Sequence, residues 1–487
     1  MATTYGSFPG VKIEVAGGGI TSVAIGAQEK LVLFGPAVYQ NDGSFPSDGE
    51  EDPLGSSLAG TVNEPEQINA RSEADDTFGD SSESQLTRAM RGALASGASV
   101  DFLYGVAPSR FNVVGEVKSS QSGTLDNSPI WEDNVDDEAN IENITATDTT
   151  DGSLTVEYDY DSPPSAPSSS DTVAVNPLTG EFSADAAPTG DYEFDYKYLD
   201  WNSAFTSNKV RTGTIDEGET GLYVALTEAD SVSTDLESEV SDRRKVYQLV
   251  NALSGASPND NEVVTSDSNS LASDHSNYQR RDARYDTSSF SSGSVNADYY
   301  FKFAPVRYAD EAHKELGAIG GVFSANGVSN PIYNDKVPGA DTLEQSFTRT
   351  EADEIRDDDV IPLRQSGSVR LKDNISTAYT EDTDWERDFW RRRIADRVIL
   401  IGKTIGDEIL GEINDEQTRN SAQRLISTEM RQLVDDRLIE PNTADKDRWF
   451  VDVYEDSVND DEVNIDIGFT PRGLAKRIDE SIIIDTN

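Results

Sequence analysis

The sequence predicts a multidomain α+β protein with an α/β core, an inserted β-sandwich-like domain and a C-terminal α/β domain built on two long helices. Three observations predict this class. A strand–helix–strand succession lies near the N-terminus, alternating polar and apolar residues dominate the middle, and helical periodicity returns near the C-terminus. With 487 residues, the chain is long enough for several domains with cores of their own.

The N-terminal third is expected to hold an extended arm and the first segment of the core. Residues 1–30 form the arm, which carries the β-prone piece Val11–Val15. Leu31–Phe34 (LVLF) is typical of a buried strand. A helix over Glu83–Ala95 follows, with apolar residues every four positions, and then a strand over Val100–Val106. This order is typical of an α/β sheet.

The middle of the chain changes character. It is rich in Asp, Ser, Thr, Pro and Gly, and Leu154–Tyr160 and Tyr192–Tyr198 alternate as half-buried strands do. Beyond it we expect a helix over Asp242–Leu253, a strand over Tyr299–Ala304 and a helix over Lys314–Phe323. The predicted divisions are an N-terminal arm (1–30), a first core segment (31–112), the inserted β-rich domain (113–230), a second core segment (231–350) and the C-terminal domain (351–487).

The best-specified element is a helix over Trp385–Leu410. Its apolar residues recur every three or four positions, as Trp390, Ile394, Val398, Ile401, Ile405 and Ile409. A second helix over Ala422–Ile439 repeats the pattern, and the short connection Gly411–Thr418 makes the pair an αα-hairpin. The strands expected around this hairpin are Gly367–Leu371, Glu462–Phe469 and Ser481–Asp485.

Composition bounds the function. Asp and Glu number 91 against 40 Lys and Arg, a formal net charge of −51 spread along the chain. Such a chain repels nucleic acid, so no nucleic-acid partner is expected. It also repels itself in ordinary salt, and molar salt would screen that repulsion. The composition resembles that of proteins from haloarchaea and their viruses. No secretory signal or membrane span is visible, so we expect a protein made in the cytoplasm that binds no membrane.

No catalytic, cofactor or metal site emerges, and we expect no enzyme. The chain has no cysteine and two histidines, His275 and His313, neither in a triad pattern. Gly402-Lys403-Thr404 resembles the end of a P-loop, but Arg397 replaces the required glycine and the stretch lies within the predicted helix. The acidic clusters lack the EF-hand pattern.

Two features carry interaction hypotheses. Five arginines crowd the start of the long helix, namely Arg387, Arg391, Arg392, Arg393 and Arg397. Arginine pairs bidentately with carboxylates. Two interpretations stay open. The arginines pair within the chain, with Glu386, Asp388 and Asp396, or Arg387, Arg391 and Arg392 dock an acidic partner.

The second feature is a β-prone strand at each end of the chain. A terminal strand either pairs within its own subunit or adds to the sheet edge of a neighbour. Strands at both ends favour exchange between subunits. The candidate residues for exchange are Val11, Ile13 and Val15 at one end and Ile482, Ile483 and Ile484 at the other.

The order of segments resembles that of the tail sheath proteins of contractile-tailed (myovirus-type) viruses. Phe8–Val15 (FPGVKIEV) is similar to the family's opening strand, and Ile68–Gly79 with the next helix and strand is similar to its first sheet segment. Gly367–Gly411, with Arg370, Trp385 and Arg391–Arg393, is similar to its C-terminal domain. The closing segments Val463–Phe469, Pro471–Ile478 and Ile482–Ile484 are similar to its final strand, short helix and last strand. The resemblance covers residues 1–110 and 230–487. Residues 320–345 lack the family's Trp-Lys-Ala-Pro-Ala-Asn-like motif.

This resemblance implies a subtilisin-like core without catalytic residues and a mechanical function. The expected protein is a sheath subunit of a virus of halophilic archaea, assembled in the host cytoplasm and located in the virion tail. It would polymerise as stacked rings around the inner tail tube, contact baseplate and tail terminator proteins, exchange terminal strands and contract to drive the tube through the host envelope. The alternatives are the sheath of a cellular contractile injection system, an acidic β-rich surface or adhesion protein and, most remotely, a subtilisin-like hydrolase.

Overall fold

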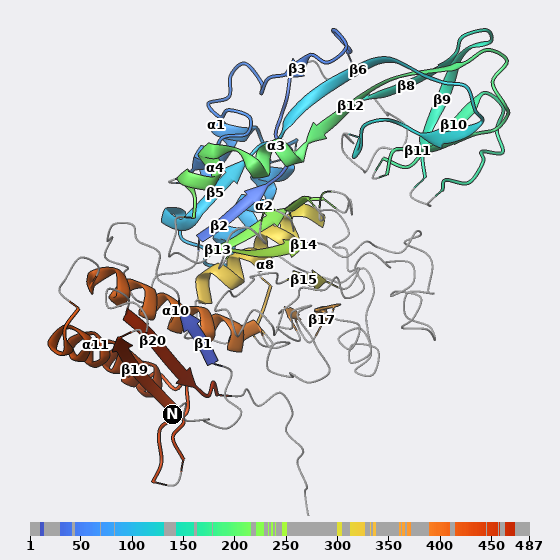
Figure 1. Ribbon diagram of the computed structural model, residues 1–487. Helices are drawn as coiled ribbons and strands as arrows, with labels where there is room; N and C mark the ends of the chain where they lie inside the picture. The colour runs from blue at the N-terminus through green and yellow to red at the C-terminus, as the bar shows by residue number, and fades with distance from the viewer. Residues whose placement is uncertain are drawn as a thin grey trace, which may run out of the picture.

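A computed structural model gives the arrangement of the chain (Figure 1). An α/β core lies between an inserted β domain at one end and a helical C-terminal region at the other. The structure describes residues 10–13, 30–40, 44–68, 70–81, 83–130, 143–159, 163–177, 179–215, 221–227, 246–250, 300–303, 312–326, 335–337, 360–361, 363–365, 368–371, 389–409, 414–444, 446–455 and 463–472, with a few single residues between them.

The core contains a seven-stranded sheet in the order β16-β15-β14-β13-β2-β5-β4. All of its pairings are parallel except that of β4 with β5. Its strands are β2 (Lys30–Phe34), β4 (Glu66–Gln67), β5 (Leu103–Val106), β13 (Gly221–Ala225), β14 (Val246–Val250), β15 (Tyr300–Phe303) and β16 (Val360–Ile361). In β2, Leu31–Phe34 is wholly buried, as strands covered on both faces are.

Helices cover both faces of this sheet. On one face lie α1 (Arg71–Phe78), α2 (Gln85–Ala95) and α8 (Ala312–Asn326). On the other lie α3 (Trp201–Thr206) and α4 (Asn208–Gly213), where Phe205 meets Phe34 edge-on with ring centroids 4.8 Å apart. Ser84 begins α2 by accepting a hydrogen bond from Thr87 N at 3.1 Å.

The inserted domain is built on one curled sheet of eight strands, in the order β3-β6-β12-β8-β9-β10-β11-β7. Phe182 on β11 and Phe194 on β12 have ring centroids 5.0 Å apart, although three strands separate them in the sheet. The sheet therefore closes around its own core. Its strands are β3 (Glu51–Asp52), β6 (Ser109–Lys118), β7 (Ser122–Thr124), β8 (Ile144–Asp148), β9 (Gly152–Tyr158), β10 (Thr172–Val175), β11 (Glu181–Ala184) and β12 (Tyr192–Asp200).

Several sequence predictions are confirmed and others are wrong. The predicted helices at 83–95 and 314–323 are α2 and α8, and the strand at 299–304 is β15. The helix predicted over Asp242–Leu253 is wrong, because Val246–Val250 is strand β14, parallel to β13 and β15. A short apolar run is ambiguous by periodicity alone. Val100–Phe102 is a 3-10 turn rather than strand. Helix α1 lies within Ile68–Gly79, the stretch that begins the segment similar to the family's first sheet segment.

The predicted division at residue 230 falls beyond α3, α4 and β13, which lie in the core, since β13 pairs with β2. After α8, β16 pairs with β15 at the edge of the core sheet, and β17 (Leu363–Gln365) pairs with β18 (Val369–Leu371). Leu371 is buried in the main core. Among the described residues, no helix is long and apolar enough to cross a membrane.

Candidate assembly interface

The C-terminal region places both long helices on a small sheet. Helices α10 (Phe389–Ile409) and α11 (Glu416–Asp435) pack against the three-stranded sheet β1-β20-β19 (Figure 1). The predicted apolar stripe is confirmed, because Trp390, Ile394, Val398, Ile401 and Ile405 are all buried in one cluster. Ile409 packs at its margin. The second helix contributes Ala422, Ile426, Met430 and Leu433, also as predicted.

Helix α11 starts earlier and ends sooner than predicted. Asp415, a residue expected in the connecting loop, caps it by accepting a hydrogen bond from Thr418 N at 2.8 Å. Residues 416–418 are therefore helical. The predicted strand at 462–469 is β20 (Val463–Phe469), but its hairpin partner β19 (Trp449–Glu455) was not predicted. The alternation of buried Val451 and Val453 with exposed Asp452 and Tyr454 is the signal that would have revealed it.

The N-terminal strand lies at the edge of this sheet. Strand β1 (Gly10–Ile13) pairs antiparallel with β20, with Val11 opposite Ile467 and Ile13 opposite Ile465. Ile465 and Ile467 are buried in the cluster formed with α10 and α11. Of the other predicted exchange residues, Val15 and Ile482, Ile483 and Ile484 lie outside the described residues.

The predicted basic cluster is divided by the fold. Arg393 is only 2% exposed and donates from its Nη2 to the carbonyl of Phe323 at 3.3 Å. Phe323 lies in the last turn of α8, where the partial negative charge of the helix end favours a cation. Arg393 thus joins the C-terminal region to the core. Its place one residue before Ile394, inside the apolar stripe, is the sequence signal for this inward position.

Arg397 also turns toward the protein. Burial lowers the pKa of its guanidinium, and the nearby carboxylates of Glu429 and Asp436 oppose that shift. Arg391 is half-buried, the side chain of Arg392 is not described, and Arg387 lies outside the described residues. The candidates for partner docking are therefore Arg391 and its neighbours at the start of α10, while Arg393 and Arg397 serve the subunit itself.

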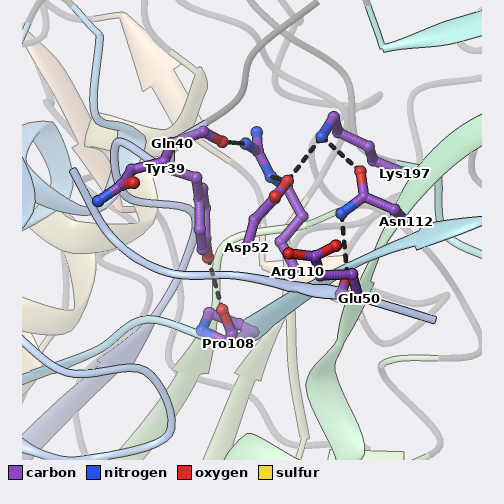
Figure 2. A network of polar contacts seen from close by, with 8 residues as sticks. All are labelled: Tyr39, Gln40, Glu50, Asp52, Pro108, Arg110, Asn112 and Lys197. Carbon is purple, nitrogen blue, oxygen red and sulfur yellow. Dashed lines mark hydrogen bonds and ion pairs between the residues drawn. The ribbon is translucent and has the colours of Figure 1, made fainter. Parts of the chain in front are cut away.

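A buried charge network fixes the base of the inserted domain (Figure 2). Asp52 Oδ2 contacts both Arg110 Nε at 3.1 Å and Lys197 Nζ at 2.6 Å, and all three side chains are wholly buried. Lys197 Nζ also donates to Asn112 Oδ1 at 2.6 Å, and Arg110 donates to the carbonyl of Gln40. These residues join β3, β6 and β12 to the segment that follows β2.

Aromatic rings complete the surroundings of the network. The Arg110 guanidinium lies 4.6 Å from the centroid of the Tyr39 ring, and Tyr39 donates from its hydroxyl to the carbonyl of Pro108 at 2.6 Å. Sequence reasoning missed this network. Strict alternation along Tyr192–Tyr198 puts Lys197 on the face opposite Phe194 and Tyr196, which a half-buried strand would expose. The strand keeps this alternation, but near its end the opposite face is covered as well, so Lys197 and Leu199 are both buried.

The described residues contain no group of three or more His, Cys, Asp or Glu side chains that could hold a metal ion. Gly402-Lys403-Thr404 lies within α10, which confirms that it is not a strand-to-helix phosphate loop. His275 lies outside the described residues, and His313 lies in the first turn of α8.

Comparisons with known proteins identify the fold. No protein-family model and no curated protein matches the sequence. Among solved structures, a chain of the anti-feeding prophage (AFP) baseplate matches with a TM-score of 0.52 and 14% identity, over 99% of this chain and 100% of that one. A chain of the PVC sheath complex, from an extracellular contractile injection system in its contracted state, matches with a TM-score of 0.50 and 13% identity, over 99% of each chain.

The chain has the fold of a contractile sheath protein. The match covers nearly the whole length of both chains. The resemblance to sheath proteins that the order of segments indicated is therefore confirmed for the fold. Two features of this fold bear on the predicted interactions. Strand β1 at the edge of β20 bears on strand exchange, and the start of α10 bears on partner docking.

Proposed function

We propose that this protein is a structural subunit of a contractile sheath. Subunits polymerise helically around an inner tube, in an extended state, and repack into a contracted state that drives the tube through a target envelope. The single observation that carries the proposal is the likeness to a contracted sheath over 99% of both chains. The function is mechanical, and catalysis has no role in it.

Strand exchange is the proposed mechanism of cohesion. Strand β1 belongs to a sheet whose other two strands come from the far end of the chain. In an assembly, β1 of one copy would take this place on β20 of a neighbour, with the same register and the same buried partners Ile465 and Ile467. Val11, Ile13 and Val15, with Ile482, Ile483 and Ile484 at the other end, are the proposed exchanged residues. Backbone pairing of this kind holds subunits together while their domains move.

The C-terminal region is proposed to face the inner tube, with Arg387, Arg391 and Arg392 as its docking residues. Baseplate and tail terminator proteins are the proposed partners at the ends of the sheath. The strongly acidic composition supports a halophilic setting, because molar salt screens the repulsion among copies of charge −51. We further propose a core related to subtilisin and, for a viral sheath, assembly in the host cytoplasm and a place in the virion tail.

A cellular injection device is the second candidate. The matched chains come from an anti-feeding prophage and from an extracellular contractile injection system. This observation supports the sheath of a cellular injection device as much as the sheath of a viral tail. Neighbouring capsid and terminase genes would assign the protein to a virus, and their absence beside injection-system genes would assign it to a cell.

Truncation tests the proposal. The purified full chain should form tubes or rings visible by electron microscopy in molar salt. Variants lacking residues 1–15 or 480–487 should stay folded by circular dichroism but form no tubes. Long tubes from the doubly truncated chain would contradict strand exchange, and a full chain that stays monomeric at every salt concentration would contradict the sheath function itself.

A further inference from the structure

Strand β19 forms the edge of the C-terminal sheet opposite β1. The carbonyl of Arg448 accepts a hydrogen bond from Thr470 N at 2.8 Å, and Phe450 lies opposite Gly468 in the same ladder. Antiparallel pairing alternates along a strand. The backbone groups of Trp449 and Val451 therefore point away from β20, toward the side where a further strand would add.

Side-chain amides already bond the N–H and carbonyl of Trp449 and the carbonyl of Val451. Asn442 accepts from Trp449 N at 2.8 Å through Oδ1 and donates to Trp449 O at 2.9 Å through Nδ2. This is the two-way contact that the peptide group of a partner strand makes. Asn442 Oδ1 also accepts from Arg448 N at 2.6 Å. From α11, Gln423 Nε2 donates to the carbonyl of Val451 at 2.7 Å.

The two edges of the sheet thus differ. On one side β20 bonds to β1, a strand from the distant end of the chain. On the other side, amides from α11 and from the segment before β19 take the ladder positions of Trp449 and Val451. We propose that Gln423 and Asn442 close the β19 edge to strands of neighbouring copies, so that the sheet grows only on the side of β20 and β1.

This inference rests on the proposed strand exchange and goes further, because it names the edge that exchange does not use and the residues that close it. It gives each subunit one acceptor edge instead of two, which makes the contacts between copies directional. An incoming strand at β19 would have to displace the amide hydrogen bonds, each worth roughly a fivefold change in an equilibrium constant.

The chain has no cysteine, so paired cysteine substitutions can report which strands meet. Lys12, Asp466 and Asp452 lie in one row across β1, β20 and β19. Chains carrying Lys12→Cys are mixed, unfolded and reassembled with chains carrying either Asp466→Cys or Asp452→Cys, oxidised and run on non-reducing gels. The same mixtures are repeated with Gln423→Ala and Asn442→Ala added to the acceptor chain, and with Gln432→Ala and Asn202→Ala as the matched control.

In acceptor chains that keep Gln423 and Asn442, covalent dimers should form through residue 466. The dimer yield through residue 452 should stay at the background level. Opening the edge should raise the yield through residue 452 by roughly tenfold or more, and the control pair should not. Equal yields of covalent dimer through residues 452 and 466 in chains with the natural edge would overturn the inference. A folded Gln423→Ala, Asn442→Ala chain that still forms no dimer through residue 452 would overturn it as well. No dimers through 466 would instead overturn the proposed strand exchange.

Discussion

Lys197 Nζ lies 2.6 Å from Asp52 Oδ2, although 145 residues separate the two in the sequence and neither side chain is exposed. The contact joins β12 to β3, the last and the first strands, in sequence order, of the eight-stranded sheet (Figure 2). Arg110 on β6 shares the same carboxylate oxygen. The inserted domain therefore leaves the core through a fixed junction of β3, β6 and β12.

Replacing Asp52 with asparagine should destabilise this junction strongly. The substitution removes the charge that two buried cations contact, and breaking a buried ion pair from one side costs about 3–5 kcal/mol. The matched control is Asp126→Asn, because the Asp126 side chain is 76% exposed in its pair with Lys118. That variant should lose less than about 1 kcal/mol. Urea unfolding curves of both variants check the difference, and equal losses would contradict the role of the network.

The tip of the inserted domain should weaken in acid through Asp148. Its carboxylate accepts hydrogen bonds from the backbone N–H groups of Thr150 (2.9 Å), Thr189 (2.8 Å), Asp151 (3.2 Å) and Gly190 (3.2 Å). These bonds, that from Thr150 first, lower the pKa of Asp148 below its ordinary value of 3.8. A lowered folded-state pKa gives stability that is present above the unfolded pKa and is lost as the pH falls through the folded pKa.

In Asp148→Asn, the amides of β8 and β9 should therefore be less protected against hydrogen exchange at neutral pH. Their protection should also fall less steeply toward acid pH than it does in the natural chain. Hydrogen exchange of the β8 and β9 amides, measured from pH 7 down to pH 3 with correction for the intrinsic exchange rate, follows this. Asp126→Asn again serves as the control and should keep the natural pH profile. Parallel declines in the natural chain and Asp148→Asn would show that this carboxylate has no such effect.

The crossing of α2 and α8 should not tolerate a methyl group. A Cβ at Gly317 would fall within 2.6 Å of Ala89 Cα, and one at Gly321 within 2.7 Å of Ala93 Cα. Gly317→Ala should cost about 1–3 kcal/mol, because overpacking outweighs the gain in helix propensity. Gly213→Ala is the control, since its Cβ would meet Pro65 at an ordinary 3.5 Å. A thermal midpoint that is unchanged or raised in Gly317→Ala would contradict the close packing.

Charge reversal tests the proposed docking face. Arg391→Glu with Arg392→Glu should weaken co-assembly of the sheath with its inner tube without blocking self-assembly. The control is Arg424→Glu with Arg431→Glu, the same change of charge at exposed positions of α11. Co-sedimentation with purified tube and electron microscopy separate the two effects. Unchanged co-assembly would return Arg391 and Arg392 to pairing within the chain.

The sequence predicts the local elements of this protein well where one periodicity extends over many residues. The stripe from Trp390 to Ile405 spans several turns, so the helix and its buried face could both be predicted. Val246–Val250 covers too few residues to distinguish strand from helix, and only its parallel partners β13 and β15 make it a strand.

The interaction features were less accessible to sequence reasoning. The arginines at the start of α10 look alike in sequence. Arg393 contacts the last turn of α8, a helix that is distant in sequence and that only the fold brings beside α10. The network at Asp52 depends on partners far apart in sequence and on the burial of both faces of β12 at Tyr196 and Lys197. The closed β19 edge depends on Asn442 and Gln423. Neither residue lies in a strand, so the alternation that reveals strands does not point to them.

Strand exchange between sheath subunits is best tested by a helical cryo-EM reconstruction of the assembled full chain, prepared in molar salt. We expect hollow tubes in which the strand on β20, with Val11 opposite Ile467, can be traced back to a neighbouring copy. Tubes in which residues 10–13 pair with β20 of their own chain would contradict strand exchange. A chain that forms no tube or ring under any condition would contradict the proposed sheath function.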